Sequence, residues 1–279
     1  MIVFIVGWIG TFFGHFVEYI PPGLILSLAA GRIEKAKYWD AYTKEFIGSM
    51  MMIAFTFSAG KWIGKEMWEL AWAWHVVGVI AADYFGGGQQ VNPAVTVSMW
   101  ALAKIDYTEA FVRIAGQMGG GMVAFPVFHI ISEMLNLEPF GGPEFKIASN
   151  AEAFLSEFGA MFLLMWAIYL LNWEFNFGEY HYWIKQFLTA VAIRALIEFF
   201  PTAGPAINPM LGTCWGAFGT SGNFEFPSDN EHYFVYWVAP CVSAVLASAT
   251  WGMYNGDLVF GTRMPVGPLK SKVKKAKKA

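Results

Sequence analysis

Charge is scarce in this sequence. Asp, Glu, Lys and Arg make up 14% of the 279 residues, whereas apolar residues make up 56%. A soluble domain typically carries about 25% charged residues, so about half of the expected charge is absent. Apolar stretches close to the ~20 residues that cross a bilayer recur along the chain. Because backbone polar groups in lipid must be satisfied within their own helix, the composition predicts an all-α membrane protein.

Cysteine and histidine are also rare, with 2 and 5 copies respectively. Cys214 and Cys241 lie in apolar surroundings without Cys or His partners at metal-ligand spacing. We interpret them as small buried residues rather than as ligands or a disulfide. No nucleophile–base pair or metal cluster is visible either, so the sequence predicts no enzyme, no cofactor and no bound metal.

Basic residues are concentrated at the C-terminus. Six of the last ten residues are lysine: Lys270, Lys272, Lys274, Lys275, Lys277 and Lys278. A lysine-rich segment beside the last span indicates the cytoplasmic or matrix side of a membrane, and it can attract anionic headgroups. Because no folded basic surface accompanies these lysines, we expect no nucleic-acid binding.

Two short apolar stretches stand out among six longer ones. The longer segments lie at roughly 39–59, 67–85, 108–132, 151–172, 182–200 and 232–254. Each short stretch follows a glycine-bearing loop and an Asn-Pro pair, in the motifs Asn92-Pro93-Ala94 and Asn208-Pro209-Met210. Asn caps a helix and Pro suits its first position. A helix of about ten residues covers only ~15 Å, about half of the hydrocarbon core. The motifs therefore predict two half-helices that end near mid-membrane.

The two halves of the chain repeat the same pattern. Glu45 lies in the first long segment and Glu157 in the fourth, at similar distances before Asn92 and Asn208. A carboxylate in a spanning helix is costly and needs a polar partner. We therefore expect each glutamate to accept hydrogen bonds from the loop before a half-helix. Three spans per half is an odd number, so the second half must be inverted, and the half-helices meet by their N-termini.

Further residues of the longer segments are Tyr38-Trp39, Glu45-Phe46, Gln117, Gly119–Gly121, Glu157-Phe158 and Tyr236-Trp237-Val238-Ala239-Pro240. Together with the two Asn-Pro motifs, they resemble the helices of the aquaporin (major intrinsic protein) family over roughly residues 38–255. The resemblance implies an aquaporin-like inverted repeat, with six transmembrane helices and two re-entrant half-helices around one pore. It divides the chain into an apolar N-terminal extension (1–36), a channel domain (37–256) and a basic C-terminal tail (257–279).

Opposed half-helices have a predictable electrostatic effect. Each helix N-terminus carries about +0.5 charge, and half-helix dipoles of this kind exclude cations and protons. We expect Asn92 and Asn208 to cap their helices through the side-chain oxygen and to turn amide N–H donors into the channel. Carbonyls at 88–90 and 204–206 would supply acceptors. The alternative is that both motifs are only buried re-entrant caps.

The resemblance also places a constriction at Trp72, Leu196, Pro205 and Leu211. Ordinary family members carry an arginine at the last of these positions. A desolvated polar group that finds no hydrogen bond costs ~1–3 kcal/mol, and narrow apolar constrictions close by dewetting. We therefore expect low water flux. Trp72 resembles the glycerol-conducting branch of the family, whereas Leu211 resembles unorthodox intracellular members.

Arg194 and Glu198 are spaced i,i+4 in the fifth segment. We interpret them as a buried structural ion pair. A proton relay is the less favoured alternative. Arg194 as a substitute for the missing arginine is also disfavoured, since it lies about 200° around the helix from Leu196 at 100° per residue.

Two functions remain open from the sequence. The first is a passive channel for small neutral solutes, such as water or glycerol, in an intracellular or organellar membrane. The alternative is an aquaporin-like structural subunit of a larger membrane complex, with a narrow or closed pore. The apolar constriction, Met210 and the N-terminal extension with His15 and Glu18 favour this alternative. The partners expected are membrane lipid and either a homotetramer or other subunits, which the extension would contact.

Overall fold

The computed structural model describes residues 35–59, 68–88, 90–137, 149–218 and 225–270. His15, Glu18 and the lysines after Lys270 lie outside the described residues, so the predicted partner contact of the extension stays a prediction. The chain clusters into two compact units, Met1–Asp40 and Ala41–Ala279. The second unit carries the features described below.

Long helical segments dominate the described residues, and they match the six predicted spans. Two of them end in π-helical turns, a third contains such a turn, and a fourth has a short 3-10 turn at each end. The segments are α3 (Lys35–Met52) with η1 (Ile53–Ala59), α5 (Trp68–Gly86), α7 (Tyr107–Met134), α8 (Asn150–Tyr169) with η2 (Leu170–Glu174), η3 (Gly178–Tyr180) with α9 (His181–Phe199) and η4 (Pro201–Ala203), and α11 (Asn230–Tyr233) with η5 (Phe234–Val238) and α12 (Ala239–Asn255).

Two short helices begin at the predicted prolines. Helix α6 spans Pro93–Ala101 and α10 spans Pro209–Phe218. Asn92 has an extended backbone, and its side-chain oxygen accepts from the Ala94 N–H at 3.0 Å. The Asn208 oxygen accepts from the Met210 N–H at the same distance. Both half-helices therefore begin where the Asn-Pro chemistry predicts, and their 9 and 10 residues are too few to cross a bilayer.

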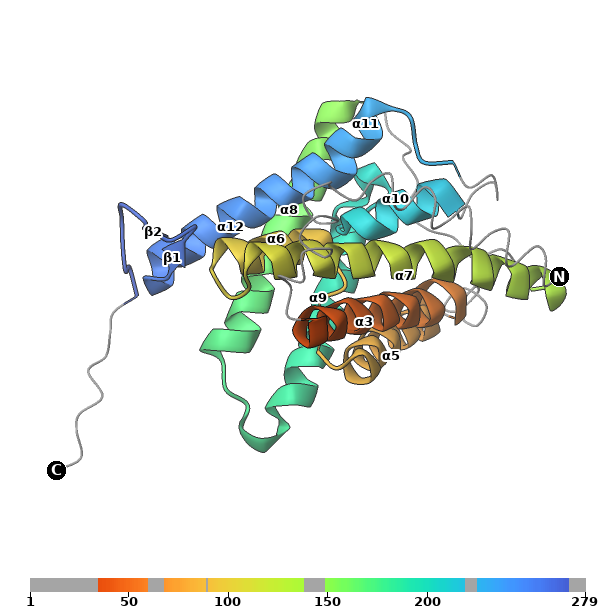
Figure 1. The fold of residues 1–279 in the computed structure, drawn as a ribbon, viewed down its shortest axis with the longest axis horizontal. Helices are drawn as coiled ribbons and strands as arrows, with labels where there is room; N and C mark the ends of the chain where they lie inside the picture. Colours follow the sequence, from red (N-terminus) through yellow and green to blue (C-terminus); the bar gives the residue numbers. More distant parts are fainter. Residues whose placement is uncertain (1–34, 60–67, 89, 138–148, 219–224, 271–279) are drawn as a thin grey trace. The chain divides into compact units, whose positions relative to one another are not determined.

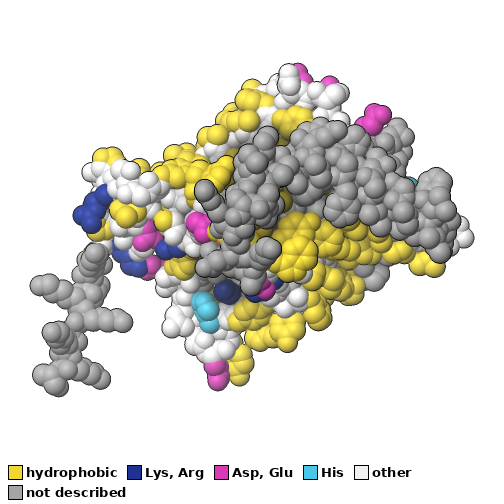
Figure 2. All heavy atoms as spheres, viewed as in Figure 1, with side chains coloured by type: hydrophobic (Ala, Val, Ile, Leu, Met, Phe, Trp, Pro, Cys, Tyr) yellow, Lys and Arg dark blue, Asp and Glu magenta, His cyan; other side chains and the backbone are white. Residues whose placement is uncertain are grey.

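Apolar surface is extensive on this molecule. Among the described residues, three helical segments are long and apolar enough to cross a membrane by length and composition, namely Tyr107–Met134, Asn150–Glu174 and Asn230–Asn255. Hydrophobic side chains cover broad areas of the face shown in Figure 2. Large side chains such as Trp183 (51% exposed), Phe187 (50%) and Leu163 (48%) lie on the surface of the chain. This surface fits lipid or other apolar neighbours.

Glycines on α7 let α3 approach closely (Figure 1). A Cβ placed on Gly116 would lie 2.5 Å from the Tyr42 carbonyl oxygen, and one on Gly120 would lie 2.4 Å from that of Phe46. Small residues four apart are a common interface between membrane helices, because packing must replace the absent hydrophobic driving force. The close approach brings Glu45 of α3 against α7.

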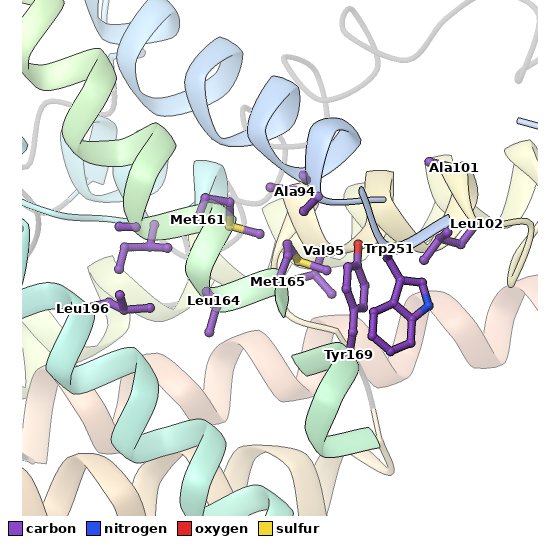
Figure 3. Close-up of a cluster of buried hydrophobic side chains, with 14 of the residues drawn as sticks. Ala94, Val95, Ala101, Leu102, Met161, Leu164, Met165, Tyr169, Leu196 and Trp251 are labelled. Atoms are coloured by element: carbon purple, nitrogen blue, oxygen red, sulfur yellow. The ribbon is translucent and has the colours of Figure 1, made fainter. Parts of the chain in front are cut away.

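A buried cluster joins α6, α8, α9 and α12 (Figure 3). Leu196 lies at one end of the labelled cluster, and Trp251 lies near the other. Among these apolar groups the hydroxyls of Ser98, Tyr169 and Ser248 hydrogen-bond to one another. Because each hydroxyl comes from a different helix, the triad ties the half-helix α6 to α8 and α12.

Residues after α12 fold back onto the core. Strands β1 (Leu258–Val259) and β2 (Thr262–Arg263) form an antiparallel hairpin. The Phe260 N–H donates to the Ala101 carbonyl at the end of α6, at 2.7 Å. Lys270 contacts Glu174, the last residue of η2. The first half of the predicted tail therefore packs on the channel domain and holds the outer end of α6.

The α3–α7 contact predicts a large difference between two glycine substitutions. Gly120→Ala should destabilise the fold by about 1–3 kcal/mol, because the new methyl group would meet a backbone carbonyl that cannot rotate away. Gly159→Ala is the matched control, since its Cβ would approach only the ring edge of Phe200, at 3.0 Å. Thermal unfolding in detergent measures both. Equal melting temperatures for the two variants would contradict the close packing.

Candidate channel site

The two Asn-Pro corners hold each other by reciprocal hydrogen bonds. The Asn92 side-chain amide donates to the Ile207 carbonyl at 2.8 Å, and the Asn208 amide donates to the Val91 carbonyl at 2.8 Å. The N-termini of α6 and α10 are thus adjacent. Each amide has two N–H groups, so one is used across the corner and one remains. That the remaining N–H groups turn into the channel stays a prediction.

Val91 and Ile207, the residues before each asparagine, share an unusual backbone conformation. Their φ angles are +50° and +49°, in the left-handed region. A β-branched residue rarely adopts this conformation, which costs of order 1–3 kcal/mol. In both residues the carbonyl accepts from the opposite asparagine. The neighbouring contacts must therefore fix this conformation at both corners.

Two buried glutamates supply those contacts. Glu45 accepts from the N–H groups of Gln90 and Val91 at 2.9 and 2.8 Å. Glu157 accepts from the N–H groups of Ala206 and Ile207 at 2.8 Å each. Both carboxylates are almost fully buried, at 0% and 1% exposed. The hydrogen bonds expected from the cost of a carboxylate in hydrocarbon are present, and they orient the loop carbonyls.

The surroundings of the two glutamates differ. Arg113 of α7 donates to Glu45 at 2.7 Å and to Glu109 at 2.8 Å, and Gln117 donates to Glu45 at 2.8 Å. Among the described residues, no cation lies within ion-pair distance of Glu157. Sequence reasoning missed the role of Arg113. The i,i+4 spacing of Glu109 and Arg113 was a signal for their pairing, but nothing local connects Arg113 with Glu45.

Met210 occupies a fully buried position in the second motif, at 0% exposed. A Cβ on Gly121 of α7 would lie 2.6 Å from the Met210 sulfur and 2.7 Å from the Cys214 sulfur. The absence of a side chain at Gly121 therefore makes room for the two sulfur atoms. The larger residue in the motif is accommodated by a smaller residue on the neighbouring helix.

The four residues of the predicted constriction lie on three elements and a loop. Leu211 is in α10 and is 7% exposed, while Leu196 belongs to the buried cluster at 8% exposed. Pro205 lies in the loop before Ile207. Trp72 lies on α5, and its indole N–H donates to Glu198 of α9 at 2.9 Å. That the four enclose one constriction stays a prediction.

Arg194 and Glu198 form the predicted i,i+4 pair at 3.1 Å, but the prediction that the pair is buried is wrong. Their side chains are 26% and 35% exposed. The guanidinium lies over the Trp72 ring, 5.9 Å from its centroid. Both residues lie about 200° around α9 from Leu196. The sequence named this pair but did not predict its contact with Trp72.

Paired half-helices joined at their N-termini, within a set of long apolar helices, define a membrane channel of the inverted-repeat class. The model of the major intrinsic protein family matches residues 32–251. The chain belongs to this family. It is accordingly an integral membrane channel protein and not an enzyme.

Relatives agree with this assignment, and a solved structure shares the fold. Glycerol uptake facilitator protein-like 6 of Lactiplantibacillus plantarum is 28% identical over 74% of this chain and 94% of its own length. Aquaporin-4 of Dipodomys merriami is 25% identical, over 78% and 67% respectively. The X-ray structure of the aquaglyceroporin from Plasmodium falciparum matches with a TM-score of 0.59 and 20% identity, covering 77% of this chain and 95% of that one.

The fit of Met210 against Gly121 predicts a coupled pair of substitutions. Gly121→Ala should destabilise the protein by about 1–3 kcal/mol, because its methyl group overlaps two buried sulfur atoms. Met210→Ala alone should cost about 2–5 kcal/mol by leaving a cavity. In the double variant the two effects should partly cancel, since alanine at 210 frees the space. A strictly additive loss of unfolding free energy in the double variant would contradict the contact.

The half-buried guanidinium of Arg113 at the first corner predicts a difference in stability between two cation substitutions. Arg113→Met should cost about 3–5 kcal/mol, because two carboxylates are left without their shared cation. Lys185→Met is the control: this lysine donates to Asn172 at 2.8 Å and forms no ion pair with Glu45. Chemical unfolding in detergent compares the two. Equal stability of both variants would show that Arg113 does not compensate Glu45.

Proposed function

We propose that this chain conducts small uncharged solutes, with glycerol-sized polyols preferred over water, through a pore at the paired Asn-Pro corners. The observation that carries the proposal is the reciprocal bonding of Asn92 and Asn208. It keeps two positive helix N-termini together while one N–H of each amide is left for a passing solute. Two partial charges of about +0.5 repel cations at this point. The roles of Pro93, Ala94, Pro209 and Met210 are to start the two half-helices and pack them.

The preference for polyols rests on the apolar constriction. Trp72, Leu196, Pro205 and Leu211 would present carbon surface to a solute at the narrowest point. A polyol carries C–H groups that need no hydrogen bond, whereas water must give up its hydrogen bonds without replacement. Two relatives bear matching names, a glycerol uptake facilitator-like protein and an aquaglyceroporin. These resemblances support a polyol channel.

We also propose a homotetramer as the assembly, with the lysine-rich tail on the cytoplasmic or matrix side. The exposed aromatic side chains of α9, Trp183 and Phe187, supply apolar surface for neighbouring copies or lipid. The alternative of a structural subunit with a closed pore is not favoured by the comparisons, because the relatives carry the names of channels. Contact of the extension with another polypeptide remains part of this proposal.

Solute flux into liposomes that hold only this protein tests the proposal. Glycerol permeability should exceed that of protein-free liposomes, and water permeability should be low. Leu211→Arg should raise water permeability by about tenfold, since a donor worth ~1.4 kcal/mol returns to the constriction. Leu258→Arg is the control, because this leucine is an exposed residue of the hairpin. Wild-type liposomes that pass neither solute, or a water flux that falls in Leu211→Arg, would contradict the proposal.

A further inference from the structure

The Trp72 indole contacts two charged residues of α9, Arg194 and Glu198. Glu198 accepts from the indole N–H at 2.9 Å, and the same oxygen accepts from Arg194 at 3.1 Å. Arg194 also lies over the indole ring. One carboxylate oxygen thus joins α5 to α9, and the ring is held both at its edge and on its face. Such a cation–ring contact is a weak attraction at a partly exposed site.

Trp72 lies away from the most exposed side of α5. At 100° per residue, position 72 lies about 80° from the buried Ala82 and about 160° from Leu70. Leu70 and Val77 lie on the opposite side and are 39% and 46% exposed. Helix α5 also packs against α9. The Glu198 contact therefore joins a half-buried ring of α5 to the neighbouring helix α9.

Helix stability does not explain the pair. Glu198 lies in the last turn of α9, which ends at Phe199, where a negative charge opposes the helix dipole. Arginine four residues before glutamate is also the less favourable order for an i,i+4 pair. The contact with Trp72 is the feature that these two residues share.

We infer that Glu198 is a positioning residue for the solute constriction: it holds the Trp72 indole in one orientation and occupies its only hydrogen-bond donor, with Arg194 as the second contact. The inference rests on the proposed function, because Trp72 must line the constriction. Trp offers a single N–H, so a donor given to Glu198 is not offered to a solute. The fixed ring presents carbon to the pore and sets its width. Loss of the contact releases the donor and removes one restraint on the ring, which should weaken the discrimination against water.

The ratio of glycerol to water permeability in liposomes is the test. Glu198→Leu should lower this ratio by at least about threefold, as expected for the loss of one partly exposed hydrogen bond. Trp72→Phe keeps the Arg194–Glu198 pair, but it removes the N–H that Glu198 holds and leaves a smaller ring at the constriction, so it should also lower the ratio. Glu198→Gln keeps an accepting oxygen and should retain the wild-type ratio. Thr250→Val is the matched control, because Thr250 accepts from the indole of Trp166 at 3.0 Å.

The double variant Trp72→Phe/Glu198→Leu shows whether Glu198 acts through the indole. If it does, the double variant should change the permeability ratio by no more than the single variant that has the larger effect. An unchanged ratio in Glu198→Leu, or changes that multiply in the double variant, would overturn the inference.

A second measurement does not require the protein to conduct any solute. The indole N–H resonance of Trp72 in ¹⁵N-labelled protein, assigned by its loss in Trp72→Phe, should move in Glu198→Leu and stay in Thr250→Val. If wild-type liposomes pass neither solute, the proposed function fails, and this resonance still decides whether Glu198 positions Trp72. A resonance that does not move in Glu198→Leu would overturn the positioning role.

Discussion

The exchange of hydrogen bonds between the asparagine of one Asn-Pro corner and the loop carbonyl of the other is the constraint on which the rest of the structure depends. Each bond is 2.8 Å long, and each accepting carbonyl belongs to a β-branched residue with positive φ. That conformation is unfavourable by itself. It is held from the N–H side by Glu45 or Glu157 and from the carbonyl side by the opposite asparagine. Either corner alone would lack one of these restraints, so the two halves specify each other.

Departures from symmetry are compensated on neighbouring helices. Glu45 shares Arg113 with Glu109, whereas Glu157 depends on backbone N–H groups. Met210 enlarges the second motif, and Gly121 supplies the space for it. In each case the changed residue and its compensation come from different elements. The half-helices therefore keep the same geometry although the residues around them differ, which is what opposed dipoles at one point require.

Local chemistry explains how much could be predicted from the sequence. The half-helices follow from Asn-Pro capping, and the glutamate contacts follow from the cost of a carboxylate in hydrocarbon. The positive φ at Val91 and Ile207 could not be foreseen, because side chains of this type argue against it. The bond from Trp72 to Glu198 joins residues 126 apart in the chain. Such contacts depend on how α5 packs against α9, and no local pattern records that packing.

Glycerol permeability of two Asn208 variants tests the central claim most directly. Serine caps a helix about as well as asparagine, but its side chain is too short to donate to the Val91 carbonyl of the other corner. Alanine supplies neither contact. If the cross-corner bond is essential, Asn208→Ser should lose permeability nearly as fully as Asn208→Ala while both proteins remain folded in the membrane. An Asn208→Ser channel that conducts glycerol at the wild-type rate would contradict the account.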